Sequence, residues 1–208
     1  LKRAEEFFLR YVDQHKTDKA RSKPAGYFYD NKHYSTAIKF YEMYDNTKMS
    51  TWKIANCHQA AGNGKKAIEK YKEVIKIWPE KTADAQYSMG QVYQGNLREY
   101  KKAIRAYRQS NKIPESIFNV GECNCSLGDH KKAIKVYKEV LFLRNDDNSA
   151  NALWRIAHEY LHMKDRKNAV KTLRGIVNRY KKTRWASSAH QKLEGWGLKT
   201  TGGAETED

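Results

Sequence analysis

The sequence is poor in proline and lacks any long apolar run. It has only 3 prolines in 208 residues, alongside 14 tyrosines and 5 tryptophans. This composition is typical of a folded, mostly helical chain rather than a disordered one. No apolar stretch approaches the ~20 residues that a transmembrane helix needs. The opening segment LKRAEEFFLRYV is amphipathic, and no signal peptide is visible because it lacks an apolar core and a small-residue cleavage site.

Cysteine is also scarce, with three residues at Cys57, Cys123 and Cys125. Cys123 and Cys125 lie two apart on a predicted helix, so their side chains should diverge and not pair. Cys57 could form a disulfide only if the fold brought it near one of them. Because there is no second cysteine pair, the sequence predicts neither a disulfide framework nor a zinc site. We expect Cys57 and Cys123 to be buried structural thiols.

Acidic residues are outnumbered by basic ones. The 24 Asp and Glu residues against 40 Lys and Arg residues give a formal net charge of +16. Such an excess favours acidic partners, anionic surfaces or nucleic acid. No nucleic-acid-binding motif accompanies it, so the charge by itself does not select among these partners.

The chain does contain a clear internal repeat. KKAI occurs at 65–68, 101–104 and 131–134. Its alanine belongs to a longer frame, in which Ile or Val follows and a Tyr or Leu lies four residues on. The alanines of the frame, the first in a partial copy, are Ala4, Ala37, Ala67, Ala103, Ala133 and Ala169. Their spacings of 33, 30, 36, 30 and 36 residues predict stacked helical hairpins.

Helix geometry explains the frame. The alanine, the bulky residue four positions on and an apolar residue near the seventh share one helix face. The small alanine should let two helices approach closely, with the Tyr filling the groove beside it. A second predicted helix precedes each frame and carries an aromatic residue three positions before a small one. These pairs are Trp52–Ala55, Tyr87–Gly90, Phe118–Gly121 and Trp154–Ala157.

This pattern resembles the tetratricopeptide repeat family. The best single match is ESIFNVGECNCSLGDHKKAIKVYKEVLFLRN, which carries Gly121, Ala133 and Tyr137 at the family's positions. The segment STWKIANCHQAAGNGKKAIEKYKEVIKIWP adds the closing Pro79. The resemblance covers roughly residues 17–182. It implies an all-α fold, a right-handed α-solenoid of about five hairpins with an N-terminal half-repeat helix and a C-terminal capping helix.

The predicted organisation has four parts. Residues 1–16 are expected to form the helix of a truncated preceding repeat, 183–196 a capping helix and 197–208 a disordered tail. The five repeats of the array 17–182 are expected near 17–47, 48–81, 82–113, 114–147 and 148–182. The half-repeat suggests a fragment or a mature form of a longer protein.

Two repeats are expected to depart from the pattern. Because Pro24 falls where a helix interior is expected, the first helix of the first repeat should start near Ser22 or be kinked. The third hairpin should have a longer turn, Gly95–Tyr100.

Helical phase places one face of each first helix on the concave side of such a stack. The residues predicted on that groove are Trp52, Asn56, Gln59, Tyr87, Gln91, Gln94, Phe118, Glu122, Cys125, Trp154, His158 and His162. Aromatic rings flanked by amides suit an extended or helical peptide, because rings supply apolar area and amides bond its backbone. The alternative is that the rings pack between hairpins as ordinary core.

Chaperone-binding members of the family hold an acidic C-terminus in this groove with Lys, Arg and Asn. Only Asn56 matches that set here, and Glu122 and Asp84 would repel a carboxylate. The resemblance therefore does not imply a clamp for a chaperone tail.

The second helices should carry a basic convex face. Its residues are Lys66, Lys70, Lys102, Arg105, Lys132, Lys135, Lys138, Lys171 and Arg174. A solvated face is the simpler interpretation. The alternative is contact with an anionic partner such as lipid head groups, lipopolysaccharide, nucleic acid or an acidic protein.

The segment HEYLH, residues 158–162, matches the zinc-protease motif H-E-x-x-H. No third ligand stands at the expected spacing, since Asp165 and Asn168 occupy those places. Glu159 also falls at a packing position of a repeat helix. We therefore expect no catalytic residue and no metal site, with adventitious metal binding by His158, His162 and Glu122 as the alternative.

The sequence thus predicts a non-enzymatic scaffold without cofactors that binds a protein or peptide in its concave groove. The alternatives are an envelope or complex-assembly module that docks through the basic face on an anionic surface, or the regulatory part of a larger enzyme. A looser resemblance to bacterial outer-membrane-assembly and cell-division tetratricopeptide proteins implies a periplasmic or cell-envelope location rather than a cytoplasmic one. The partner and the oligomeric state stay open.

Overall fold

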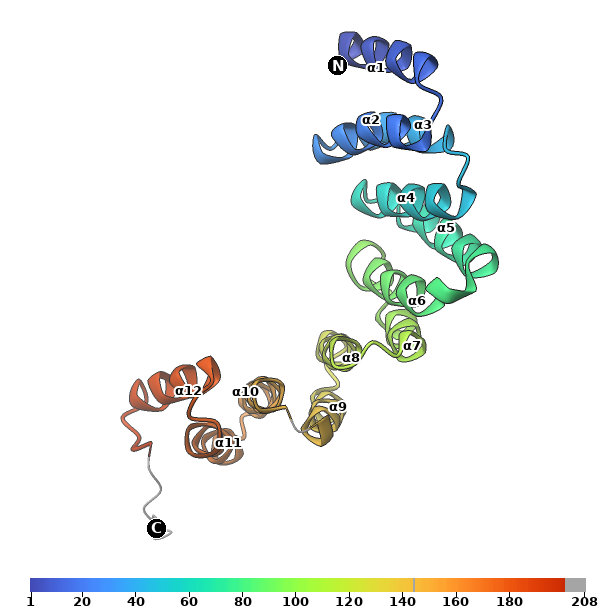
Figure 1. Ribbon diagram of the computed structural model, residues 1–208. Coiled ribbons are helices and arrows are strands. Elements are labelled where there is room, and N and C mark those ends of the chain that lie inside the picture. The colour runs from blue at the N-terminus through green and yellow to red at the C-terminus, as the bar shows by residue number, and fades with distance from the viewer. Residues whose placement is uncertain (144, 201–208) are drawn as a thin grey trace. The chain divides into compact units, whose positions relative to one another are not determined.

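The computed structural model describes residues 1–143 and 145–200 (Figure 1). Within these ranges the chain forms twelve α-helices and no strand, which confirms the predicted all-α class. It divides into two compact units, Leu1–Ser110 and Asn111–Asp208. No helix of the described residues is both long enough and apolar enough to span a membrane.

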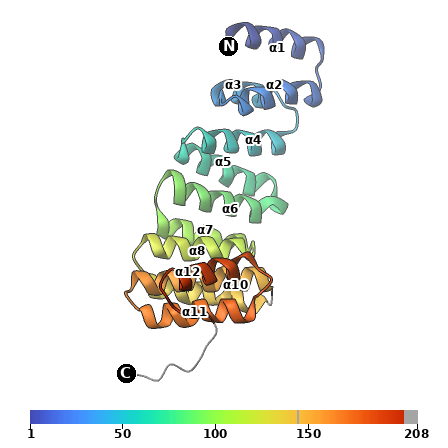
Figure 2. The ribbon, with the colours of Figure 1, turned by 90° about the vertical axis from the view of Figure 1, so that its left-hand side faces the viewer.

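The first unit contains α1 and three helical hairpins, which Figure 2 shows stacked in chain order. The helices are α1 (Lys2–Gln14), α2 (Asp18–Asp30), α3 (Tyr34–Glu42), α4 (Thr47–Ala60), α5 (Gly64–Ile77), α6 (Thr82–Gln91) and α7 (Tyr100–Ser110). A 3-10 turn, η1 (Pro79–Lys81), precedes α6, and a π-helix, η2 (Val92–Asn96), follows it. Besides the contacts inside each hairpin, α4 packs on α3 and α6 packs on α5.

The second unit contains two hairpins and a final helix. Its elements are α8 (Glu115–Ser126), α9 (His130–Val140), the 3-10 turn η3 (Leu141–Leu143), α10 (Asp146–His162), α11 (Arg166–Arg179) and α12 (Arg184–Glu194). Figure 1 shows α8, α10 and α12 on one side of this unit and α9 and α11 on the other. The final helix packs on both α10 and α11.

Small residues at the helix crossings make room for tyrosine rings, as the sequence predicts. A Cβ atom added to Gly90 would lie 2.6 Å from Cδ1 of Tyr107. A Cβ on Gly121 would likewise overlap the ring of Tyr137. Both tyrosine side chains are fully buried. The close approach of the two helices of a hairpin therefore depends on the missing side chain.

The first helix of the first hairpin departs from the expected start near Ser22. The helix begins at Asp18, and the side chain of Thr17 accepts a hydrogen bond from the backbone N–H of Ala20. This cap supplies the start signal upstream, and the helix continues through Pro24 to Asp30. A proline inside a helix removes one backbone hydrogen bond. The buried pyrrolidine ring and the neighbouring Ala25 and Phe28 belong to the packed face of the helix.

All three cysteines are free thiols. Cys57 and Cys123 are fully buried, which confirms their predicted structural role. Burial raises the pKa of each of these two thiols to about 12. Both are therefore protonated, weakly nucleophilic side chains at neutral pH.

The third hairpin contains the predicted longer connection, with different boundaries. After α6 the backbone widens into the π-helix η2, and Tyr100, expected in the turn, is the first residue of α7. Ala103 follows Gly90 by 13 positions, whereas Ala133 follows the equivalent Gly121 of the fourth hairpin by 12 positions. The π-helix accommodates the additional residue, because each of its turns holds about one residue more than an α-helical turn.

The long turn packs on the preceding hairpin. The side-chain amide of Asn96 donates a hydrogen bond to the carbonyl oxygen of Gln59 over 3.2 Å. Leu97 approaches Gly64 so closely that a Cβ added to that glycine would lie 2.8 Å from its Cδ2. The turn thus joins the second and third hairpins.

The last helix covers the end of the second unit. Leu193 of α12 is buried with Ala157 and Leu173 of the preceding hairpin, and Leu198 packs against the same cluster. The side chain of Arg174 donates a hydrogen bond to the carbonyl oxygen of Lys199. Residues 201–208 of the predicted tail lie outside the described residues.

Candidate functional site

A cavity of about 460 Å³ opens on the α8–α10–α12 side of the second unit. Its lining brings together five residues that the sequence analysis placed on the groove. They are Glu122 and Cys125 of α8 and Trp154, His158 and His162 of α10. Residues predicted on successive hairpins therefore meet at one site in this unit.

One wall of the cavity is aromatic. The rings of Trp154 and Trp185 lie with their centroids 6.1 Å apart, and the ring of His158 lies 4.8 Å from that of Trp154. The ammonium group of Lys192 sits 5.8 Å from the centre of the Trp154 ring. Trp185 and Lys192 come from α12. Sequence reasoning missed both residues. The only sequence feature that could have indicated them was the aromatic residue at the start of the expected capping helix.

Arg155 also lines the cavity, and the sequence analysis missed this residue too. Its guanidinium forms an ion pair with the carboxylate of Glu122. The same group lies 5.1 Å from the ring centre of Phe118 and 5.8 Å from that of Tyr137. Glu122 is therefore not a lone negative charge in the groove. Phe118, which was predicted on the groove, is not among the residues that line this cavity.

Glu159 of the HEYLH segment is a buried residue of the cavity lining. Its Oε2 lies 2.7 Å from Nδ1 of His130, which belongs to the preceding hairpin. The ring of His130 stacks on that of His162 at a centroid distance of 5.4 Å. Glu159 thus joins two hairpins, as its predicted packing position implies, but it also lines the cavity, which the sequence did not predict. Among the described residues, no cluster of three or more His, Cys, Asp or Glu side chains could hold a metal ion.

Two nitrogen atoms at the cavity have no hydrogen-bond partner. They are Nε2 of His158 and Nε1 of Trp185, both of which are buried. An unpaired buried polar atom costs about 1–3 kcal/mol. Burial, followed by the nearby charge of Lys192, lowers the pKa of His158, so the neutral imidazole is favoured. Both groups could gain a hydrogen bond if a ligand presented oxygen atoms to them.

In the first unit, the predicted groove residues contact the buried tyrosine of their own hairpin. The ring of Trp52 meets that of Tyr71 edge-on at 5.6 Å, and Tyr87 meets Tyr107 at 5.5 Å. Trp52 and Tyr87 stay half-buried. The rings therefore belong partly to the packing of each hairpin and partly to its surface.

The groove amides of this unit are held by tyrosine hydroxyls. The hydroxyl of Tyr71 lies 2.8 Å from Oδ1 of Asn56 and 2.6 Å from Oε1 of Gln59. The hydroxyl of Tyr107 donates to Oε1 of Gln94 over 2.7 Å. Gln91, by contrast, is exposed. The hydroxyl of Tyr71 carries one hydrogen, so it can donate to only one of its two amide oxygens at a time.

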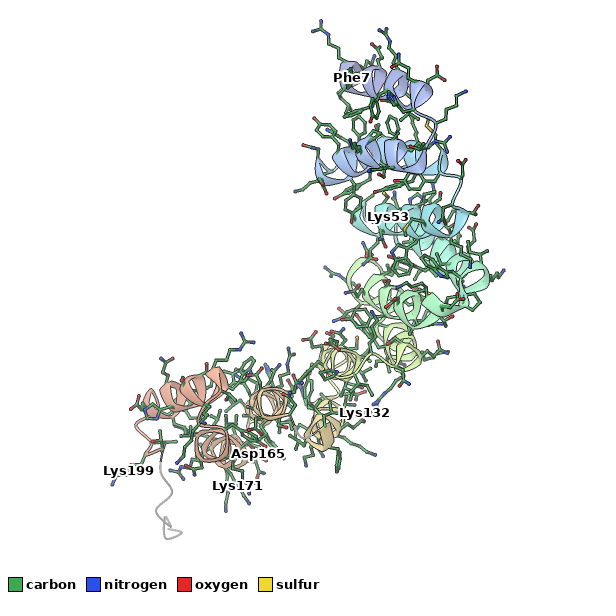
Figure 3. All side chains as sticks on the ribbon, in the orientation of Figure 1. Phe7, Lys53, Lys132, Asp165, Lys171 and Lys199 are labelled. Carbon is green, nitrogen blue, oxygen red and sulfur yellow. The ribbon has the colours of Figure 1, made fainter. Side chains whose placement is uncertain are left out.

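The predicted basic face consists of exposed or half-buried side chains. Figure 3 shows Lys132 of α9 and Lys171 of α11 pointing outward. Several of these charges have acidic neighbours one helical turn away: Lys70 pairs with Glu73, and Lys132 pairs with Asp129. Exposed pairs of this kind contribute about 0–1 kcal/mol to stability. Most side chains of the predicted set are exposed, namely Lys66, Lys102, Arg105, Lys132, Lys135, Lys138 and Lys171. The half-buried ones are Lys70 and Arg174.

Comparison with known proteins supports the tetratricopeptide repeat family. Sequence profiles described as tetratricopeptide repeat match residues 50–81, 83–117 and 150–182. No curated protein matches the chain. The similarities that follow are therefore to solved structures.

Three such structures illustrate the similarity of fold. A crystal structure of MamA is 21% identical, with 82% of this chain and 96% of that chain covered and a TM-score of 0.59. MamA from Desulfovibrio magneticus RS-1, from residue 41 to its end, is 13% identical, with coverages of 77% and 93% and a TM-score of 0.60. YrrB, described as a TPR protein with an unusual peptide-binding site, is 16% identical, with coverages of 88% and 97% and a TM-score of 0.56.

Proposed function

We propose that this chain, a tetratricopeptide repeat protein and a scaffold for protein–protein interaction, binds a peptide segment of its partner on the α8–α10–α12 side of the second unit. The observation that carries this proposal is the cavity with a tryptophan wall and two buried, unpaired nitrogen atoms. The binding role needs no chemical step and no cofactor.

The chemistry of the cavity suits a peptide. Trp154 and Trp185 offer a rigid apolar surface for a side chain of the partner, and tryptophan is enriched at the energetic centres of interfaces. The N–H of Trp185 can only donate, so its natural partner is an oxygen atom such as a backbone carbonyl. A small shift of either ring on binding would expose these nitrogens to the peptide.

The similarity to YrrB supports the same kind of ligand. That protein is described as having an unusual peptide-binding site. In the present chain, the amide oxygens of Asn56 and Gln59 lie within hydrogen-bond distance of the Tyr71 hydroxyl. We propose that the first unit adds contacts from these two amides of α4 to a peptide backbone.

Site-specific crosslinking tests the proposal directly. A photoreactive benzoylphenylalanine at Ser126, an exposed residue of the cavity lining, should crosslink to a partner in the host cell. The same group at Lys138, on the outer helix α9, is the matched control and should not capture the same peptide. Mass spectrometry of the crosslinked fragment identifies the segment that occupies the site.

A variant then connects the crosslink to the tryptophan wall. Trp154→Leu keeps an apolar side chain and removes the ring, so it should reduce the crosslink at Ser126 at least ten-fold while circular dichroism is unchanged. A crosslink that persists at full yield in this variant would refute the assignment of the site.

The basic outer helices offer a second candidate function, docking on an anionic surface. Lys135, Lys138 and Lys171 are exposed, which favours it. Charge reversal at Lys135 and Lys138, compared with Trp154→Leu, discriminates the two. If partner capture survives the loss of the ring and vanishes on charge reversal, the outer face is the functional one.

A further inference from the structure

A second hollow lies in the first unit, away from the predicted groove. It has a volume of about 370 Å³ and lies among α5, α6, η2 and α7. Its floor contains Ile75, Tyr93 and Ala106, and three basic side chains stand around it. We refer to this hollow as the α5–α7 slot.

The slot coincides with the irregular part of the repeat. Tyr93 belongs to the π-helix η2, where the third hairpin accommodates one additional residue. Opposite it, Ala106 occupies the position that Lys70 has in the second hairpin and Val136 in the fourth, so the floor there is open. The wider turn at η2 and the small side chain of Ala106 together create a hollow that the other hairpins do not share at these positions. Single π-turns inside helical segments occur frequently at functional sites.

The charged side chains among the described residues that line the slot are all basic. Lys72 comes from α5, and Lys102 and Arg105 come from α7. All three side chains are exposed. Lys102 and Arg105 are three residues apart on one helix, where like charges repel. An anionic ligand would relieve this repulsion.

Lys102 is also held in place. Its ammonium group lies 2.7 Å from Oε2 of Glu99 and 5.8 Å from the ring centre of Tyr93. These contacts keep the charge at the edge of the slot before any ligand arrives, which reduces the entropy lost on binding. The pair with Glu99 is exposed and contributes little energy, so it can exchange for a ligand carboxylate.

The remaining lining favours a peptide over a lipid. A hollow of about 370 Å³ accommodates one large side chain but offers no channel for an acyl chain. The carboxamides of Gln86 and Gln109 flank the slot and can bond the backbone of a peptide. Charge complementarity requires acidic residues beside the inserted side chain.

We propose that the α5–α7 slot binds an acidic segment of a partner protein, with one aromatic or large apolar side chain inserted over Tyr93 and Ala106 and flanking carboxylates on Lys72, Lys102 and Arg105. This site does not depend on the proposed use of the α8–α10–α12 cavity, since all of its residues belong to the first unit.

A defined peptide tests this assignment. The probe is a capped pentapeptide with phenylalanine between two pairs of glutamates, titrated by isothermal calorimetry at 50 and 200 mM salt. We expect saturable binding to the full chain that weakens at higher salt. A peptide with alanine in place of phenylalanine, and one with glutamines in place of glutamates, should each bind at least ten-fold more weakly.

The chain supplies a matched pair of variants. Lys102→Glu with Arg105→Glu reverses two charges three residues apart on α7. Lys19→Glu with Lys23→Glu reverses two charges four residues apart on α2, which belongs to the same unit but lines neither the slot nor the basic outer face. The first should weaken the probe at least ten-fold, and the second should change its Kd less than two-fold. All four positions are exposed, so circular dichroism should show both variants folded.

Four outcomes would overturn the proposal. The slot is not the binding site if both double variants weaken the probe equally, since the attraction is then general. It is not an apolar anchor site if the alanine peptide binds as tightly as the phenylalanine peptide. Absence of binding at 1 mM probe contradicts it outright. Displacement of the probe by phosphatidylserine vesicles, but not by phosphatidylcholine vesicles, would assign the surface to a membrane instead.

Discussion

Gly90 and Tyr107 are packed so closely that no side chain fits between them. A Cβ added to the glycine would lie 2.6 Å from the tyrosine ring. The same relationship joins Gly121 and Tyr137 in the fourth hairpin. The contact explains why the repeat places a glycine inside a helix, where it otherwise lowers stability by about 0.5–1 kcal/mol relative to alanine.

Gly90→Ala should therefore destabilise the chain although alanine is the better helix former. Overpacking of a well-filled core costs about 1–3 kcal/mol, which exceeds the gain in helix propensity. The matched control is Gly26→Ala, because Gly26 lies inside α2 of the same unit with no atom within 4 Å of its added Cβ. We expect a lower urea midpoint for Gly90→Ala and an equal or higher one for Gly26→Ala. Equal effects of the two substitutions would disprove the packing argument.

Glu159 should prove to be a structural residue and not a catalytic base. Its carboxylate is buried against His130, so Glu159→Ala should lower the free energy of unfolding by about 1–3 kcal/mol. Glu159→Gln keeps a hydrogen-bond acceptor and should cost less, and Glu115→Ala at an exposed site is the control. With added zinc, neither the wild-type chain nor Glu159→Gln should hydrolyse casein. Turnover in the wild type that disappears in Glu159→Gln would reverse this assignment.

Stability should fall as the solution becomes mildly acidic. Burial, then the charges of Lys192 and His162, hold the pKa of His158 below its usual value of 6.5, and burial likewise lowers the pKa of His58. The unfolded chain therefore takes up these protons at a higher pH than the folded chain does. Their contribution to stability is complete above pH 6.5 and is lost progressively below it.

Urea unfolding at pH 7.5 and pH 5.0 measures this effect. His158→Gln should reduce the difference between the two midpoints, because it removes a group whose protonation favours the unfolded state. Gln191→Ala, at an exposed position of α12, removes no titratable group, so it is the control and should leave the difference nearly unchanged. An identical pH dependence in wild type and His158→Gln would contradict the prediction.

Much of the fold could be predicted because its information is local. The alanine of each frame and the tyrosine four residues on lie on one helix face, so spacing alone identifies the contact between the two helices of a hairpin. The buried thiols of Cys57 and Cys123 follow from the same reasoning. Of the two alternatives that Pro24 suggested, a start near Ser22 is wrong, because the Thr17 cap starts the helix upstream at Asp18.

The candidate site could be predicted only in part, because the residues that line it come from different helices. Helical phase identified Trp154 and His158, which lie on one face of α10. It did not identify Trp185, since the position of α12 depends on how the chain turns after α11. Nor did it show that Arg155 neutralises Glu122 across two hairpins. Such contacts depend on the relative placement of helices, for which a single periodic pattern carries no signal.

The sequence by itself determined the helical class, the hairpin repeat and the small residues at the crossings, because each depends on the fixed 3.6-residue period of one helix. Only the tertiary structure decided that the π-helix at Val92–Asn96 opens a slot above Ala106, and that Trp154 and Trp185 share one wall. Both features arise where helices from different parts of the chain meet. Their geometry depends on packing energies summed over many contacts. The spacing of residues within one helix does not predict that sum.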